Sequence, residues 1–208
     1  MTRRTALRQR WRLLLVVTAA LIARPHPVAA DSPGALQSHA VAVLAGGCYW
    51  GVESVFRHVR GVRSATSGYA LPARSGSIFV QRVEAVRIVY DPSQISYRQI
   101  LDVFFSVVHD PTELDRQGPD VGAEYRSVVF VDGDRQREVV RAYIDSLSAS
   151  RVFPRPIVTE IAALRGFQVV EESQQDYAAR HPADPYIVAY DVPKLEALRR
   201  RFPRLYRN

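Results

Sequence analysis

Sulfur-containing residues are almost absent from this chain. Its 208 residues include one cysteine, Cys48, and one methionine, the initiator Met1. A single cysteine excludes an intrachain disulfide and a zinc site built from several thiolates. A lone thiol is buried and inert, paired with another molecule, or kept for its reactivity. Loss of Met1 on processing would also leave no methionine for oxidants to attack.

Acidic residues are missing from the first thirty positions. Residues 1–30 contain six arginines and no Asp or Glu, so the net charge of +7 falls to +7 − 6 = +1 for the remainder. A nearly neutral remainder argues against a nucleic-acid-binding protein, which needs a basic surface on its folded domain.

The same segment has the three parts of an export signal: a basic leader, an apolar run at 13–23, and small residues at 28–30. We therefore predict cleavage after Ala30 and an exported location, periplasmic or secreted. The apolar run is shorter than the roughly 20 residues that span a bilayer. An uncleaved N-terminal membrane anchor is the alternative, because Arg24 and Pro25 interrupt the approach to the cleavage site.

After a linker at 31–39, residues 40–208 are long enough for one well-buried domain. Alternating and helical patterns predict strands at 40–45, 62–67, 83–90, 126–131 and 158–163, and helices at 49–58, 97–108, 135–148, 173–180 and 194–201. Ser96 and Asp134 are the expected N-caps. Strands that alternate with helices, without internal repeats, predict an open sheet covered by helices in an α/β or α+β domain.

Cys48 lies at the turn between the first strand and the first helix, in the segment Gly46-Gly47-Cys48-Tyr49-Trp50-Gly51. Unpaired backbone N–H groups and the helix dipole favour a thiolate at this position. The aromatic rings of Tyr49 and Trp50 suit an apolar or thioether-bearing substrate. The alternative is an inert cysteine buried among core aromatics, which is the commoner outcome for an arbitrary single cysteine.

Many separate segments of the chain carry one resemblance. They are Gly46–Glu53, Gly61–Val62, Ser67–Tyr69, Glu84–Pro92, His109–Thr112, Gln117–Ser127, Gln174–Tyr177 and Pro185–Val188. In collinear order, over roughly residues 40 to 206, they closely resemble the A-type peptide methionine sulfoxide reductases. The resemblance implies a two-layer α+β sandwich of a mixed sheet with helices, related to ferredoxin-like folds.

The resemblance also implies an activity: thiol-dependent reduction of methionine S-sulfoxide, in proteins or as the free amino acid. In such an enzyme the thiolate of Cys48 would attack the sulfoxide sulfur, and Glu84 would protonate the departing oxygen, leaving a sulfenic acid on Cys48. A carboxyl with a raised pKa would suit this role. Without the resemblance, Glu84 would be expected to face solvent from an alternating strand.

Substrate contacts follow from the same match. Asp120 and Tyr125 would line the pocket and hydrogen-bond the substrate, and Tyr49 and Trp50 would cradle its S-methyl group. The stretch between Tyr69 and Glu84 is shorter than the usual family pattern, and a second pocket tyrosine is missing from it. In the matching segment Gln117–Ser127, Pro119 and Glu124 stand where Asn and Gln are more usual in the family. These departures put catalytic efficiency in question more than identity.

Regeneration needs an external thiol, because no second cysteine exists to resolve a sulfenic acid on Cys48. We expect a thioredoxin-like protein or a small thiol as reductant, and oxidised proteins or peptides as substrates. The sequence has no glycine-rich phosphate loop or dinucleotide fingerprint, and its histidines lack metal-ligand spacing. We therefore predict no bound cofactor, no metal, no nucleic-acid partner and no stable membrane association after cleavage.

Two other functions compete with this interpretation. A different cysteine-nucleophile enzyme, such as a hydrolase, would need a base, and His109 would be the candidate. The second is a catalytically weakened protein that still binds methionine sulfoxide, motivated by the shortened stretch before Glu84.

Overall fold

The structure is a computed structural model that describes residues 39–72 and 82–208. The predicted signal segment, most of the linker, and residues 73–81 of the shortened stretch lie outside the described residues. Within the two described ranges, no helix combines the length and apolar character needed to cross a membrane.

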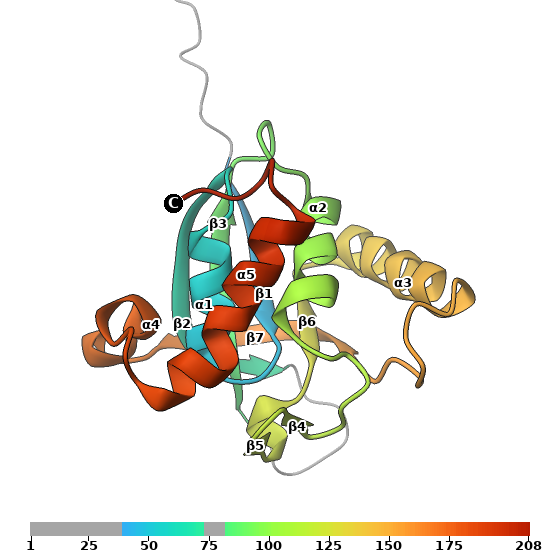
Figure 1. Cartoon of the computed structure of the whole chain (residues 1–208). Coiled ribbons are helices and arrows are strands. Elements are labelled where there is room, and N and C mark those ends of the chain that lie inside the picture. The colour runs from blue at the N-terminus through green and yellow to red at the C-terminus, as the bar shows by residue number, and fades with distance from the viewer. Residues whose placement is uncertain (1–38, 73–81) are drawn as a thin grey trace, which may run out of the picture. The chain divides into compact units, whose positions relative to one another are not determined.

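Five strands close into a barrel in the order β1-β3-β2-β7-β6 (Figure 1). Their bounds are β1 Ala40–Ala45, β2 Val62–Pro72, β3 Val83–Tyr90, β6 Val128–Val131 and β7 Glu160–Val169. Four of the pairings are antiparallel, and β6 pairs with β7 in parallel. The prediction of a mixed sheet with helices is confirmed.

The predicted open arrangement is wrong because β7 runs well beyond the predicted 158–163. Its first residues, from Glu160, pair with β6, and its last residues, to Val169, pair with β2. One strand thus joins the two edges that an open sheet would leave free. β2 is likewise longer than predicted.

Side chains alternate between the inside of the barrel and the side covered by helices. The inward set is mostly small: Val43, Ala45, Ala70, Val83, Ala85, Val128 and Phe130. Small residues suit the narrow interior of a five-stranded barrel. The opposite face of the same strands carries larger residues such as Leu44, Val86 and Ile88, which join the main core with the helices.

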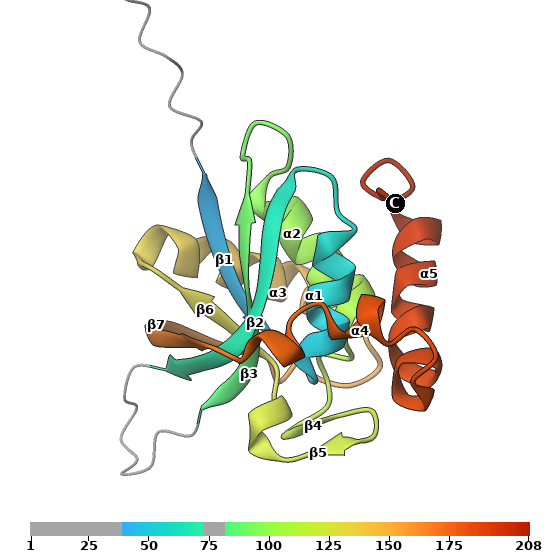
Figure 2. The same ribbon diagram turned by 90° about the vertical axis from the view of Figure 1, so that its left-hand side faces the viewer.

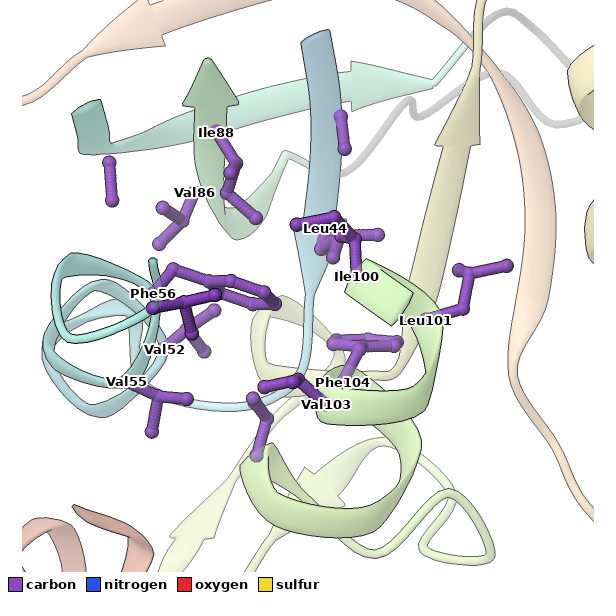
Figure 3. Packing of buried hydrophobic residues seen from close by; sticks show 14 of the residues in the cluster. Leu44, Val52, Val55, Phe56, Val86, Ile88, Ile100, Leu101, Val103 and Phe104 are labelled. Atoms are coloured by element: carbon purple, nitrogen blue, oxygen red, sulfur yellow. The ribbon is translucent and has the colours of Figure 1, made fainter. Parts of the chain in front are cut away.

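The helices α1 Tyr49–Arg57, α2 Tyr97–Val103 and α5 Val192–Arg201 lie on the same side of the strands (Figure 2). Figure 3 shows Val52 and Phe56 of α1 on the side of the helix that faces Leu44 of β1 and residues of α2 in the core. The remaining long helix, α3 Asp134–Ala149, packs against β6 and β7.

One predicted cap is confirmed and one is wrong. Ser96 caps α2 with a full capping box to Gln99. Asp134 is the first residue of α3, whereas the cap position belongs to Gly133.

Two predicted helices are interrupted, and several short elements were not predicted. Beyond α2 the predicted helix continues as the π-helix η1 Phe104–Val108, and the predicted helix at 173–180 becomes the 3-10 helix η3 Glu172–Gln174 followed by α4 Tyr177–Arg180. The unpredicted elements are β4 Arg116–Gln117, β5 Asp120–Val121, the 3-10 helix η2 Ala123–Tyr125 and the π-helix η4 Ile187–Asp191.

Candidate active site

Cys48 is the N-cap residue of α1, directly after the Gly46-Gly47 turn. Gly47 has a positive φ of +92°, and a Cβ built there would lie 2.7 Å from the side chain of Gln117. Glycine is therefore needed at position 47 both for the backbone conformation and for the close approach of β4.

The thiol lines a cavity of about 220 Å³. Four parts of the chain meet there: the α1 turn with Cys48, the end of η1 with His109, the β4–β5 ribbon with Asp120, and the C-terminal segment with Tyr186 and Lys194. Cys48 itself is only 8% exposed. The cavity is thus a small pocket that gives limited access to one sulfur atom.

The environment of Cys48 favours the protonated thiol. Burial raises the pKa of Cys48 to about 12, and the carboxylate of Glu84 adds to the rise. The backbone N–H of Trp50 and the hydroxyl of Tyr186 act in the opposite direction by hydrogen bonding. A backbone N–H at the helix N-terminus does lower the pKa of Cys48, as expected. The prediction of a favoured thiolate is nevertheless wrong, because burial and Glu84 raise this pKa by more than the N–H lowers it.

Glu84 lies on the helix-covered face of β3 and is 8% exposed, so it does not face solvent. Its Oε2 accepts a hydrogen bond of 3.1 Å from the backbone N–H of Tyr49, the residue after Cys48. Burial raises the pKa of Glu84 to about 7, and the carboxylates of Asp120 and Glu124 contribute to the rise. This carboxyl therefore takes up and releases a proton near neutral pH.

The departure at Glu124 has an electrostatic consequence. A glutamate at this position places a negative charge close enough to help hold the proton on Glu84. The other departure, Pro119, lines the Cys48 cavity.

Asp120 and Tyr186 form a short hydrogen bond across the cavity, with the Tyr186 hydroxyl 2.5 Å from Asp120 Oδ2. Burial raises the pKa of Tyr186, and the neighbouring charges of Cys48 and Asp120 raise it further, so the hydroxyl keeps its proton. Tyr186 was not among the site residues predicted from the sequence. Its one signal was membership of the matching segment Pro185–Val188.

Tyr125 lies close to the same ionisable side chains. Burial raises the pKa of Tyr125 to about 12, and Glu84, Asp120 and Cys48 each add to the rise. The structure thus brings Tyr125 together with Cys48, Glu84 and Asp120, as the resemblance implied.

Tyr49 and Trp50 are held from the other side by the C-terminal segment. The Tyr49 hydroxyl and the Trp50 indole N–H both donate to Oε1 of Gln174, at 3.4 and 3.2 Å. The Trp50 ring stacks on Tyr177 with centroids 3.9 Å apart and lies edge-on to Tyr186 at 5.9 Å. Tyr49 lines a neighbouring groove with Tyr69 rather than the Cys48 cavity.

His109 lines the Cys48 cavity but has no free ring nitrogen. Nδ1 lies 3.1 Å from the carbonyl oxygen of Phe104, which can only accept, so Nδ1 carries the proton. Nε2 then accepts from the Ser127 hydroxyl at 2.7 Å. Burial lowers the pKa of His109 to about 4. A histidine with both nitrogens engaged does not serve as a base for Cys48, which counts against the hydrolase alternative.

Among residues 39–72 and 82–208, no group of three or more His, Cys, Asp or Glu side chains is arranged to hold a metal ion.

Comparison with known proteins identifies the family of this chain. The family description "Peptide methionine sulfoxide reductase" matches residues 40–205. The Mesorhizobium japonicum protein named peptide methionine sulfoxide reductase MsrA 2 is 44% identical over 172 residues, covering 79% of this chain and 88% of that protein. A Synechocystis protein of the same name is 41% identical over 187 residues, covering 86% and 87%.

Solved structures agree. Methionine sulfoxide reductase A of Corynebacterium diphtheriae aligns with a TM-score of 0.57 at 29% identity, covering 76% of this chain and 82% of that one. Reduced Mxr1 of Saccharomyces cerevisiae aligns with a TM-score of 0.61 at 26% identity, covering 70% and 87%.

The fold and the comparisons together define an oxidoreductase built on a mixed sheet with helices. The chain belongs to the peptide methionine sulfoxide reductase family. It is an enzyme that reduces methionine sulfoxide with thiol as the source of electrons.

Substitution of Glu84 by Gln tests the electrostatic coupling within this site. The amide removes a negative charge that raises the pKa of Cys48, so the thiol pKa is expected to fall. A fall of one unit corresponds to about tenfold faster alkylation by iodoacetamide at pH 8. The measurement is the pH dependence of alkylation followed by mass spectrometry. Glu160→Gln, on an exposed residue, is the matched control, and equal rates in all three proteins would contradict the coupling.

Proposed function

We propose that Cys48 is the nucleophile of this reductase and Glu84 its proton donor. One observation carries the proposal: Glu84, a buried carboxyl whose pKa is raised to about 7, accepts a hydrogen bond from the first residue of the helix that Cys48 caps. Because Oε2 takes that N–H bond, the proton of the neutral carboxyl would lie on Oε1 and be donated from there to the substrate.

The proposed reaction balances without any other group. The Cys48 sulfur bonds to the sulfoxide sulfur, the S–O bond of the substrate breaks as the oxygen bonds to the Cys48 sulfur, and the S–S bond breaks to release methionine, which leaves a sulfenic acid on Cys48. The methionine sulfur gains two electrons and Cys48 loses two. Glu84 supplies the proton that the oxygen needs, and the proton of the thiol restores Glu84.

The protonation states of Glu84 and Cys48 are compatible with this step. With pKa values of about 7 for Glu84 and about 12 for Cys48, the two groups share one proton between these values. Moving that proton from the thiol to the carboxyl creates a thiolate and an acid without changing the net charge. A sulfoxide oxygen that accepts from Glu84 favours this arrangement.

Substrate binding is proposed to use the remaining site residues. Asp120, Tyr125 and Tyr186 would surround the sulfoxide oxygen, with Tyr186 offering a hydroxyl in place of the tyrosine missing from the shortened stretch. Trp50, fixed by Gln174 and Tyr177, would present its edge to the S-methyl group, with Tyr49 beside it. Preference for the S-sulfoxide follows from the family alone.

Regeneration is proposed to use an external thiol, a thioredoxin-like protein or a small thiol. The first thiol would displace water from the sulfenic acid to form a mixed disulfide with Cys48, and a second would release Cys48 as the thiol. The composition supports this proposal, since Cys48 is the only cysteine in the chain.

We further infer that the domain is a closed variant of a ferredoxin-like two-layer sandwich. The order β1-α1-β2-β3-α2-β6, with neighbours β6-β1-β3-β2, follows the split βαβ pattern of that fold. β7 would then be the addition that joins β2 to β6.

We propose that residues 1–30 direct export and are removed after Ala30, on the strength of their basic leader, apolar run and small residues. Expression of the whole chain in an exporting bacterial host, followed by N-terminal sequencing of the periplasmic product, is expected to begin at Asp31. A chain that keeps Met1 and sediments with membranes would support the uncleaved anchor instead.

A single-turnover assay tests the catalytic assignment. Residues 31–208 with a peptide carrying methionine S-sulfoxide are expected to yield one equivalent of methionine and one sulfenic acid on Cys48. Cys48→Ser should form none, and Glu84→Gln should be slower by roughly 10²-fold, as for loss of an acid catalyst. The rate should rise as pH passes about 7, because the pair must first lose one of its two protons. Peptide binding without any methionine formed would favour the weakened binding protein.

Tyr186→Phe tests the hydroxyl that the sequence analysis missed. It removes one hydrogen-bond donor while keeping the ring, so the chemical step is expected to slow by roughly 10- to 100-fold. The single-turnover rate at saturating peptide measures it, and Tyr206→Phe, on a tyrosine stacked with His58 away from the cavity, is the control. An unchanged rate would assign Tyr186 a purely structural role.

A further inference from the structure

Lys194 is the only lysine in the chain; the other 27 of its 28 basic residues are arginines. It lies on α5, and its side chain, 18% exposed, lines the same cavity as Cys48. His109 also lines this cavity but is neutral at physiological pH, since burial lowers its pKa to about 4. Among the residues that line the cavity in the described parts of the chain, Lys194 is therefore the one basic side chain other than this neutral histidine.

Lys194 is held in place by a buried acid. Its Nζ donates to Oδ1 of Asp191 at 3.1 Å, and Asp191 is 1% exposed. Oδ2 of Asp191 has no hydrogen-bond partner in the described chain. A buried carboxylate with one unpartnered oxygen depends heavily on its single cation.

The ion pair packs directly against the first turn of α1. A Cβ built on Gly51 would lie 2.2 Å from Asp191 Oδ1 and 2.5 Å from Lys194 Nζ. Glycine is less favourable than alanine in the interior of a helix. Gly51 nevertheless lies in α1, three residues after Cys48, because any side chain at this position would occupy the space of the Asp191–Lys194 pair.

The other charged side chains that are known to act on Cys48 and Glu84 in the described parts of the chain are negative. Glu84 of β3 and Asp191 of η4 both disfavour the thiolate, and Asp120 of β5 and Glu124 of η2 act on Glu84. The neutral Tyr186 hydroxyl, which donates to Asp120, lies close enough to the sulfur to lower the pKa of Cys48. An attacking thiolate would thus form among carboxylates, which makes the placement of the one cation decisive.

We propose that the Asp191–Lys194 pair is a positioning device for the reaction, in which Asp191 holds the Lys194 ammonium at the cavity to stabilise negative charge on the Cys48 sulfur. The charge appears on the attacking thiolate and again on the thiolate released from the mixed disulfide. This inference rests on the proposed role of Cys48. A compact ammonium fits the space over Gly51, whereas a planar guanidinium is broader, which accounts for a lysine in an otherwise arginine-based chain.

Charge-removing variants test the pair through the reactivity of the thiol. Lys194→Met should leave Asp191 unopposed and slow alkylation of Cys48 at pH 8 by about tenfold, equivalent to one pKa unit. Asp191→Asn should speed it, and the double variant should return to within about threefold of the starting protein. Arg199→Met, which removes an exposed cation from the same helix, should change nothing. The single-turnover rates of the same variants should follow the same order.

Two outcomes of this series would overturn the proposal. One is an unchanged alkylation rate in Lys194→Met. The other is a double variant at least as slow as Lys194→Met, which would show loss of packing rather than of charge.

A second measurement needs no change at Lys194 and holds even if that variant fails to fold. Growth with [ε-¹³C]lysine gives one labelled side chain, because the sequence contains one lysine. Its NMR shift at pH 8 is expected to change when iodoacetate places a carboxylate on the Cys48 sulfur, and to stay unchanged after the same treatment of Cys48→Ser. An unchanged shift after modification of Cys48 would refute the coupling.

Alkylation and NMR report on the thiol without turnover, so they separate this inference from the proposed function. If methionine were still formed by Cys48→Ser, the catalytic assignment would fail while the coupling could stand. If single turnover followed the catalytic proposal but charge removal at Lys194 had no effect, only the ion-pair inference would fail.

Discussion

The hydrogen bond between the Tyr49 N–H and the Glu84 carboxylate joins the two halves of this site. One partner is the first residue of α1, and the other is a buried position on β3. The bond satisfies one of the free N–H groups at the helix start and places a carboxyl beside the sulfur that caps the same helix. Glu84 remains buried there because its face of β3 packs under helices, which is also why it keeps its proton up to about pH 7. Fold and chemistry therefore depend on the same contact.

The C-terminal segment completes what the strands begin. Glu53, 2% exposed in α1, accepts hydrogen bonds from the Ser67 hydroxyl and from the backbone N–H of Asp176. This anchor fixes the stretch that carries Gln174 and Tyr177, and those two residues fix Trp50. Farther along, the chain returns to the cavity with Tyr186 and Lys194. A site built from a turn, a strand and a distant terminal segment needs such buried polar anchors, because nothing in the local sequence orients the segment.

The sequence could predict what short-range rules determine. Strand β3, from Val83 to Tyr90, begins and ends where the alternating pattern placed it, and the Ser96 cap was evident from the serine and the glutamine three residues later. Barrel closure was not predictable, because it depends on the two halves of β7 choosing different partners. The resemblance located Cys48, Glu84, Asp120 and Tyr125. It could not show that burial outweighs the helix N-terminus at the thiol, since burial is a property of the packed domain.

A raised thiol pKa in a thiol enzyme is a coherent arrangement rather than a contradiction. A permanent thiolate would be open to any oxidant that reached the cavity, and this chain has no second cysteine to rescue an oxidised Cys48 by forming a disulfide. In the proposed mechanism, a thiol that shares its proton with Glu84 would gain nucleophilic character chiefly when a substrate oxygen accepts from the acid. The carboxylates around the sulfur would then protect it selectively, because a bound sulfoxide would relieve the opposing charge of Glu84 and a simple thiol oxidant lacking that oxygen contact would not.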